Sequence, residues 1–259
     1  MRRRFLADEL HGNTAVLTGQ NAAHLARVLR ARVGQEYEIG ALGAVRIGKI
    51  TTIADDRVEL ELGAPIASHQ LVPITLVAAI FKFDRFEWAI EKATELGVAR
   101  IIPVIARRTD AHLATSAAKR VERWRRIAHE ASQQSRRTSP PEIAEPVKLK
   151  DALGLRSAGD SPATVRSSPG FNSETASPPD AGLKILLSEV EADRSLRSVL
   201  EDARAHSISL AIGPEGGWTE DELQLFASAG WTSATLGPTI LRAETAVVAA
   251  LALTAALTD

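Results

Sequence analysis

Apolar and polar residues alternate in short runs over the first 72 residues. The runs TAVLT at 14–18 and RVELEL at 57–62 are typical, and Gly, Asn and Asp separate them from the runs beside them. Alternation with a period of two predicts β-strands that bury one face. Residues 21–31 have helical spacing instead, with Asn21 as the predicted N-cap. Residues 1–72 are therefore predicted to form a small β-rich domain.

Continuous apolar runs replace this alternation from residue 73 onward. The runs at 74–80, 98–106, 183–188 and 207–212 are typical of strands that are buried on both faces. Segments with helical spacing lie between them, and strands that alternate with helices indicate a largely parallel sheet. The predicted fold class is therefore α/β, with residues 73–259 as a second domain.

Three helices of this second domain are clearly patterned. One starts at Phe83, has apolar residues three or four positions apart, and ends before Gly97. Another covers about 116–134 and has one basic side. The last starts at Ala243 and is apolar on nearly every face, so we expect the rest of the chain or a second subunit to cover it.

The composition is that of a folded chain with one exception. Hydrophobic residues make up 45% of the sequence and charged residues 24%, which allows a sizeable core. Residues 154–182, however, are poor in large apolar groups and rich in Ser, Pro, Gly and Thr. Such a segment cannot offset the entropy lost on ordering, so we predict a disordered surface insertion.

Missing residue types exclude several classes of function. The chain has no cysteine, which excludes disulfides, thiolate metal sites and a cysteine nucleophile and favours a reducing compartment, the cytoplasm. The six histidines have no metal-ligand spacing, so no metal site is predicted. The longest apolar run is shorter than the roughly 20 residues of a membrane span, and no membrane association is expected.

Charge is unevenly distributed along the chain. The net charge is −1, yet residues 107–137 hold nine basic and three acidic residues, and residues 1–32 hold six arginines and two acids. A chain that is neutral in sum but basic in two blocks can present a phosphate-binding face. The alternative is a solvated surface whose counter-charges lie elsewhere.

The segment IGPEGGWTEDEL at 212–223 joins a strand to a helix through glycines. Thr219 and Glu222 have the spacing of a capping box, so the helix begins there. Open α/β sheets bind ligands at such carboxyl ends of strands, and glycine lets the backbone approach a ligand closely. A tight turn without a ligand is the alternative. The glycine patterns of dinucleotide-binding and P-loop proteins are absent from the sequence, which gives those assignments no support.

A second junction of this kind lies at 235–251. Gly237 and Pro238 make a turn after a short predicted strand, and Arg242 stands at the start of the apolar last helix. A charged side chain beside an apolar element is a candidate for function. A core helix with a surface arginine is the alternative.

Five segments occur in a set order along the chain. They are HLARVLR followed by VGQEYEI, KFDRFEWAIEKATELGVARIIPV, RWRRIAHEASQQSRR followed by PP, IGPEGGWTEDEL, and LGPTILRAETA. Together they resemble the RsmE family, the small-subunit (16S) ribosomal RNA uridine-N3 methyltransferases of the SPOUT superfamily. Each segment is weak by itself, but five in the right order with the right gaps are specific, and the resemblance covers nearly the whole chain.

The resemblance implies a two-part α/β protein. A small N-terminal PUA-like β-barrel would help to hold RNA, and a C-terminal SPOUT domain would thread its chain into a trefoil knot. It implies a homodimer packed through the knotted domains, which would account for the apolar last helix. The implied cofactor is S-adenosyl-L-methionine, and the implied partner is small-subunit ribosomal RNA or the 30S subunit.

The resemblance also places the cofactor among three loops, each of which follows a predicted strand. The residues it assigns to cofactor binding are Leu187, Ser188, Ile212, Gly213, Gly216, Gly217, Leu236, Gly237, Leu241, Arg242, Glu244 and Thr245. Recognition of the adenine edge by the backbone would explain the glycines, because a Cβ atom would hold the backbone groups away from the ligand.

Arg242 is the predicted catalytic residue. Uracil N3 must lose its proton before it attacks a methyl group, and a cation beside the pocket would stabilise the charge on O2 or O4. A general base stays open between Glu215 and Glu244, because Glu215 could serve only the turn and Glu244 only the helix N-terminus.

RNA is expected to bind through basic side chains that contact phosphates and position the substrate, with the target base unstacked. These residues are Arg2, Arg3, Arg4, Arg27 and Arg30 of the first domain and Arg107, Arg123, Arg126, Arg136 and Arg137 of the second. Two alternatives share these features: a related knotted methyltransferase that acts on transfer RNA, and a non-catalytic RNA-binding ribosome-assembly factor.

Overall fold

The computed structural model describes residues 4–41, 44–54, 56–66, 72–135, 137–155, 182–202 and 205–258. Arg2, Arg3, Arg136 and most of the insertion predicted at 154–182 lie outside the described residues.

The chain forms two compact units. One consists of Met1–Leu71 and Arg125–Pro141, and the other of Val72–Trp124 and Glu142–Asp259. The sequence pattern divides the chain once, near residue 72, and gives no sign that the second segment returns to the first unit.

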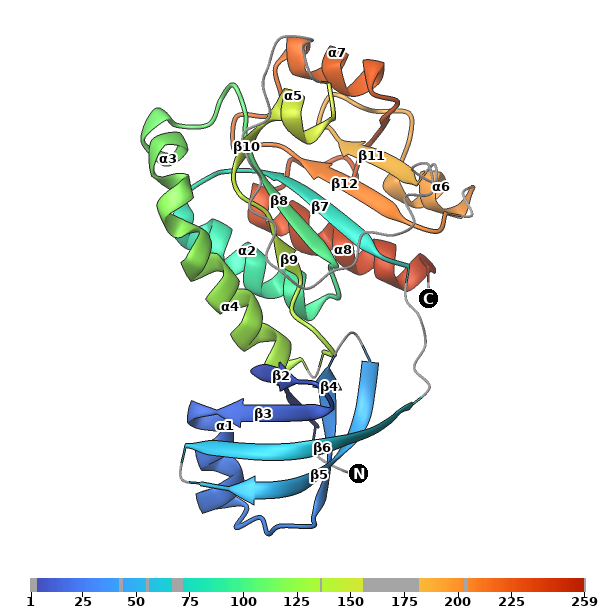
Figure 1. The fold of residues 1–259 in the computed structure, drawn as a ribbon. Helices are drawn as coiled ribbons and strands as arrows, with labels where there is room; N and C mark the ends of the chain where they lie inside the picture. The colour runs from blue at the N-terminus through green and yellow to red at the C-terminus, as the bar shows by residue number, and fades with distance from the viewer. Residues whose placement is uncertain are drawn as a thin grey trace. The chain divides into compact units, whose positions relative to one another are not determined.

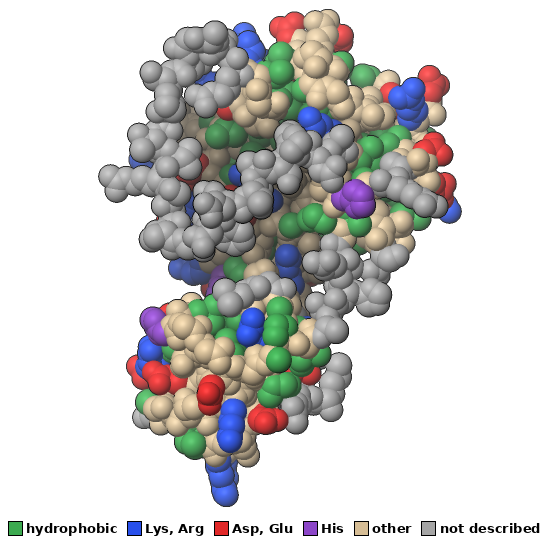
Figure 2. Space-filling view, turned by 45° about the vertical axis from the view of Figure 1, so that its right-hand side comes forward, with side chains coloured by type: hydrophobic (Ala, Val, Ile, Leu, Met, Phe, Trp, Pro, Cys, Tyr) green, Lys and Arg blue, Asp and Glu red, His purple; other side chains and the backbone are tan. Residues whose placement is uncertain are grey.

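The first unit is built on a six-stranded sheet. Its strands are β1 (Arg4–Leu6), β2 (Glu9–His11), β3 (Thr14–Thr18), β4 (Glu36–Ala41), β5 (Ala44–Ile53) and β6 (Arg57–Ile66). They pair in the order β1-β4-β5-β6-β3-β2, and only the β1–β4 pair is parallel. Alternate residues such as Leu17, Ile39 and Leu60 fill its core, as the period of two predicts. Basic and acidic side chains are interspersed on the face of this unit that Figure 2 shows.

The helix predicted at 21–31 differs from expectation. It begins as α1 (Gly19–Ala23) and continues as a π-helical turn, His24–Val28. Thr18 is the N-cap, so the prediction that Asn21 caps the helix was wrong. Leu25 is fully buried in the core of the unit, which shows that tertiary packing rather than capping places this helix.

The segment that follows α4 (Val121–Gln134) completes the first unit against β4. A Cβ atom on Gly40 would lie 2.9 Å from the carbonyl oxygen of Arg137 and 3.0 Å from Cα of Thr138. Side chains do not approach backbone this closely, so glycine is needed there. His129 Nε2 also lies 3.2 Å from Asp8 Oδ1. Residues more than 90 positions apart in sequence therefore close this unit.

The second unit contains the parallel sheet that the sequence predicts. Its strands are β7 (Ile74–Ala79), β8 (Arg100–Ile105), β9 (Glu142–Ile143), β10 (Val147–Lys148), β11 (Leu183–Leu187), β12 (Ile208–Ile212) and β13 (Thr232–Ala234). They pair in the order β10-β8-β7-β12-β11-β13, with β9 beside β8, and every pair is parallel.

Helices cover both faces of this sheet (Figure 1). The helical segments of the unit are α2 (Phe83–Glu95), α3 (Ala111–Ser116), the 3₁₀ turn Ala117–Arg120, the start of α4, α5 (Leu149–Ala152), α6 (Leu196–Glu201), α7 (Glu220–Ser228) and α8 (Ala243–Thr258). Figure 1 shows α2 and α8 on one face and α5 and α7 on the other. Phe226 of α7 packs with Val77 and Ala211 of the sheet.

Helix α2 starts at Phe83, and Gly97 follows its end with a φ of +90°, as predicted. Helix α8 is only partly enclosed by this chain. Val247 and Leu251 are fully buried, whereas Val248 and Leu253 are partly exposed. No helix in the described part of the chain is long and apolar enough to cross a membrane.

Candidate functional site

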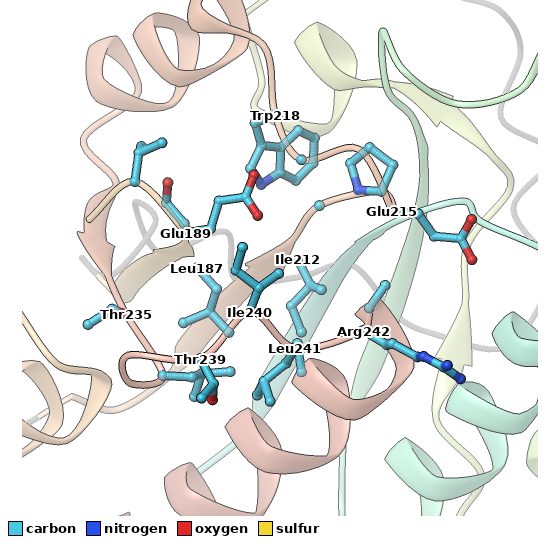
Figure 3. Close-up of a pocket in the computed structure, with 18 of the residues that line it drawn as sticks. Leu187, Glu189, Ile212, Glu215, Trp218, Thr235, Thr239, Ile240, Leu241 and Arg242 are labelled. Atoms are coloured by element: carbon cyan, nitrogen blue, oxygen red, sulfur yellow. The ribbon is translucent and has the colours of Figure 1, made fainter. Parts of the chain in front are cut away.

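A cavity of about 490 Å³ opens in the second unit, at the carboxyl ends of the neighbouring strands β12, β11 and β13 (Figure 3). This volume lies in the range of roughly 300–1,000 Å³ that is common for small-molecule sites. The predicted residues that line it are Leu187, Ser188, Ile212, Gly213, Gly217, Leu236, Gly237, Leu241 and Arg242. Three loops predicted from separate parts of the sequence therefore border one space.

Three residues predicted for the same role are not among those that line the cavity: Gly216, Glu244 and Thr245. Gly216, in the turn after β12, and Thr245, in the first turn of α8, are both exposed to solvent. Among the other lining residues are four polar or charged side chains that the sequence reasoning missed, namely Lys82, Arg85, Glu189 and Trp218. Lys82 and Arg85 follow β7, the strand next to β12. Knowledge of this strand order would have pointed to them.

The glycines of the turn at 213–217 face protein side chains. A Cβ atom on Gly213 would lie 3.1 Å from Nε1 of Trp218, and one on Gly217 would lie 2.7 Å from Oε1 of Glu189. Gly217 also has a φ of +70°, which favours glycine. The space that we expected a ligand to fill is thus partly occupied by an indole ring and a carboxylate.

Contacts from the loop after β8 hold this turn in place. The guanidinium of Arg108 donates to the carbonyl oxygen of Gly216. The buried Glu222 carboxylate accepts from the backbone N–H of Arg107 at 2.7 Å and from that of Thr219 at 2.9 Å. Thr219 and Glu222 form the predicted capping box at the start of α7, which confirms that prediction. A buried carboxylate with several donors makes the turn a preformed wall.

The turn between β13 and α8 is much more open. The Thr235 hydroxyl oxygen accepts from the N–H of Gly237 at 3.2 Å, but residues 237–240 are all exposed. Ile240 is 82% exposed, although it lines the cavity. Gly237 has a φ of +130° and nothing within 4 Å of the position of a Cβ atom.

Arg242 lies at the end of this turn and lines the cavity; its exposed side chain extends away from Leu187, Ile240 and Trp218 (Figure 3). Among the described residues, its guanidinium has no hydrogen bond or ion pair. A cation that no carboxylate neutralises keeps its donors available for a ligand.

Arg85 connects both carboxylates that the sequence left open as general base. Its Nη1 lies 2.9 Å from Oε1 of Glu215 and 3.7 Å from Oε1 of Glu244. The other oxygen of Glu244 is buried without a partner in the described structure. Arg85 therefore holds together the start of α2, the glycine turn and the start of α8.

The loop after β11 is stabilised by the carboxylate of Glu191, which accepts hydrogen bonds within the loop. The Glu191 carboxylate accepts from the backbone N–H groups of Asp193 at 2.9 Å and Arg194 at 3.3 Å. These hydrogen bonds favour the ionised form and lower the pKa of Glu191.

Comparisons with known proteins agree on one family. The RNA methyltransferase domain profile matches residues 68–255. A protein from Synechocystis called ribosomal RNA small subunit methyltransferase E is 31% identical over 92% of this chain and 72% of its own length. The chain belongs to the RsmE family. A Mycobacterium bovis relative with the same name is also 31% identical, over 96% of this chain and 88% of its own.

A solved RsmE structure shares the fold. The ribosomal RNA small subunit methyltransferase E from Neisseria gonorrhoeae, bound to S-adenosyl methionine, is 30% identical to this chain. The similarity covers 97% of this chain and 96% of that one, with a TM-score of 0.71. The mixed α/β architecture described above is thus an RsmE architecture.

The arginines that this RsmE chain was predicted to use for RNA differ in their surroundings. In the first unit, Arg4 pairs with Glu38 at 3.0 Å and Arg137 is partly buried. Burial lowers the pKa of the Arg137 guanidinium, because desolvation disfavours its charged form.

The other described arginines are exposed: Arg27, Arg30 and Arg126 in the first unit and Arg107 and Arg123 in the second. Arg123 pairs with Glu87 at 2.8 Å, and Arg126 lies 3.9 Å from Glu130. Such surface pairs are weak and can be exchanged for phosphate contacts. No cluster of three or more potential metal ligands occurs in the described part of the chain.

Proposed function

We propose that this protein is an S-adenosylmethionine-dependent methyltransferase that modifies N3 of one uridine in small-subunit (16S) ribosomal RNA. One observation carries the proposal: loops after three neighbouring parallel strands border a single cavity in a chain that is 30% identical to an RsmE structure with bound S-adenosyl methionine. A cytoplasmic location is part of the proposal and agrees with a chain that contains no cysteine.

The residues at the cavity fit such a cofactor. Apolar side chains from all three loops, Leu187, Ile212 and Leu241, can pack against a flat base. Charged side chains of both signs also line the cavity, together with the unpartnered Nε1–H of Trp218. A pocket that combines apolar walls with a few placed polar groups is the usual form of a cofactor site. When bound, S-adenosylmethionine supplies a methyl group activated by its positively charged sulfur.

The chain's own part in the reaction is to place and polarise the target base. We assign Arg242 to the uracil, because this residue lines the cavity and its guanidinium has no partner in the described residues. Its N–H groups would donate to a uracil carbonyl oxygen and stabilise the negative charge left when N3 loses its proton. Holding uracil N3 in line with the methyl carbon and the sulfur of the cofactor would further accelerate the transfer.

The proposal extends to the two parts of the fold. We assign residues 1–72 to a PUA-like RNA-binding barrel and residues 73–259 to a SPOUT domain with a trefoil knot. Supporting features are the curled, mainly antiparallel sheet of the first unit and the strand order β7-β12-β11-β13, in which chain order and spatial order differ. The exposed arginines Arg27, Arg30 and Arg107 would contact RNA phosphates.

We further propose that the protein is a homodimer in which α8 contributes to the interface. Val248 and Leu253 of this helix are partly exposed in the single chain, and partly exposed apolar side chains on one helix favour burial by a partner. Light scattering should give twice the 27.7 kDa of the chain. A Leu253→Glu variant should give the monomer mass.

Mass spectrometry of 16S ribosomal RNA tests the proposed reaction. RNA from cells that lack the protein should lack one N3-methyluridine, and expression of the intact gene should restore it. Expression of Arg242→Ala should not restore it. If the 16S RNA is unchanged while a transfer RNA loses a methyl group, the substrate assignment is wrong.

A further inference from the structure

One end of the cavity holds a donor and an acceptor without partners. The Trp218 side chain is 7% exposed, and its Nε1–H makes no hydrogen bond in the described structure. The Glu189 carboxylate lies near it at the cavity (Figure 3) and likewise forms no hydrogen bond or ion pair with a described residue. Buried N–H groups in native proteins are nearly always paired, so this donor needs an acceptor from outside the chain.

Both groups lie against the glycine turn: Trp218 directly follows it, and Glu189 comes from the loop after β11. The indole nitrogen of Trp218 lies over Gly213, and Oε1 of Glu189 lies over Gly217. Since Arg108 and Glu222 brace this turn, the indole nitrogen has a set position. The exposed Glu189 side chain can turn aside to admit a ligand atom beside it.

An N–H donor next to a carboxylate matches a hydroxyl group. A hydroxyl accepts a hydrogen bond from one and donates to the other, whereas an ammonium group has no lone pair for the indole. A ligand carboxylate would be repelled by Glu189. Acidic side chains at the carboxyl ends of strands bind ribose hydroxyls in other α/β nucleotide sites.

The remaining charged residues of the cavity leave this end to a neutral group. Lys82, Arg85, Glu215 and Arg242 also line the cavity, and Figure 3 shows Glu215 and Arg242 on a different side from Glu189. Arg85 pairs with Glu215, so Lys82 and Arg242 suit the anionic parts of a ligand or substrate. The cavity is therefore polarised, which gives an asymmetric cofactor one preferred orientation.

We propose that Trp218 and Glu189 form a ribose subsite: Nε1–H of Trp218 donates to a ribose hydroxyl of the cofactor, and that diol donates to the Glu189 carboxylate. This inference rests on the proposed function, since it takes the ligand to be an adenosine derivative. It identifies two specificity residues that a backbone-only pocket would not need.

Titration calorimetry on the full-length protein tests the subsite with two ligands. S-Adenosylhomocysteine has both ribose and an amino-acid part, and 5′-methylthioadenosine keeps the ribose but lacks the amino-acid part. Trp218→Phe removes only the N–H, and Glu189→Gln removes the charge from an exposed side chain. We expect each variant to bind both ligands about tenfold more weakly, which is the effect of losing one hydrogen bond to the ligand.

Matched controls are present in the same unit. Trp231→Phe changes an indole that packs on Phe226 but does not line the cavity, and Glu220→Gln changes an exposed acid in the first turn of α7. Both controls should bind like the unaltered protein.

The outcomes separate the subsite from the proposed function. Unchanged affinity in Trp218→Phe and Glu189→Gln overturns the subsite while the function stands. A loss confined to S-adenosylhomocysteine assigns the pair to the amino-acid part and overturns the ribose assignment. If the unaltered protein binds neither ligand, the proposed function fails, and the subsite fails with it. Because Glu189 is exposed, its variant folds even if the Trp218 variant does not.

Discussion

Two turns border the cavity, and they are held in different ways. The turn at 213–217 is held by three residues outside it: the Trp218 ring, the Arg108 guanidinium and the buried Glu222 carboxylate. The turn at 235–242 has hydrogen bonds to Thr235 at its start and then four exposed residues in succession. The first is a rigid wall set by folding, and the second is free to adjust to a ligand.

This difference separates stability from activity. Substitutions in the packed turn should lower stability and change the cavity together, because extra atoms in a close-packed region force neighbouring side chains to shift. Substitutions in the open turn change what the cavity binds or does while the fold is unaffected.

The largest expected effect is a loss of catalytic rate when Arg242 of the open turn is replaced. Arg242→Ala should lower single-turnover methylation roughly 10²–10³-fold, as for loss of one donor to a developing oxyanion. Its melting temperature and its affinity for S-adenosylmethionine should be nearly unchanged. Arg197→Ala, which removes an exposed arginine of α6, is the control and should keep full activity. Equal single-turnover rates for both variants would remove Arg242 from the mechanism.

In the packed turn, Gly213→Val should cost about 1–3 kcal/mol of unfolding free energy, because its Cβ would press on the Trp218 ring. Affinity for S-adenosylmethionine should fall in parallel, since the ring lines the cavity. Urea unfolding and calorimetry measure the two effects. A variant with normal stability and weak binding would show that the glycine faces the ligand after all.

Glu222→Gln tests the brace without touching the cavity wall. The amide nitrogen cannot accept a hydrogen bond, so the N–H of either Arg107 or Thr219 loses its partner. We expect a loss of about 1–3 kcal/mol in stability by chemical denaturation. Glu220→Gln, an exposed neighbour in the same helix, should show no loss. Equal stability of the two variants would mean that the brace is unimportant.

The smallest effect is expected at the exposed tip of the open turn. Ile240→Ser should leave the melting temperature unchanged, because the side chain is 82% exposed. Affinity for S-adenosylmethionine should fall about fivefold if the side chain closes over the ligand, equivalent to about 1 kcal/mol of apolar contact. Thermal scans with and without ligand measure both. A destabilisation like that of Gly213→Val would contradict the contrast between the turns.

Periodicity and capping residues were enough to predict the parallel sheet and most of its helices. The capping box at Thr219 and the helix end before Gly97 are local features, and the structure confirms both. Asn21 failed as a cap because the burial of Leu25 decides where that helix lies. Local signals are overridden where a tertiary contact is stronger.

The cavity could be located from the sequence, but its wall could not be completed. Strand ends point to the loops, whereas contacts between distant segments do not. Arg85 with Glu215 and Arg108 with Gly216 join residues more than 100 positions apart. No periodic pattern records such pairs, and the glycines were consequently assigned to a ligand when side chains fill much of their space.

The contact between Gly40 and the residues after α4 sets an order of events during synthesis. The first unit contains Arg125–Pro141, so its last piece leaves the ribosome 70 residues after Leu71. At about 5–20 residues per second this delay is roughly 4–14 s. During that time the part of β4 around Gly40 that this segment covers in the folded unit is exposed, and we expect it to be a site where chaperones bind the unfinished chain.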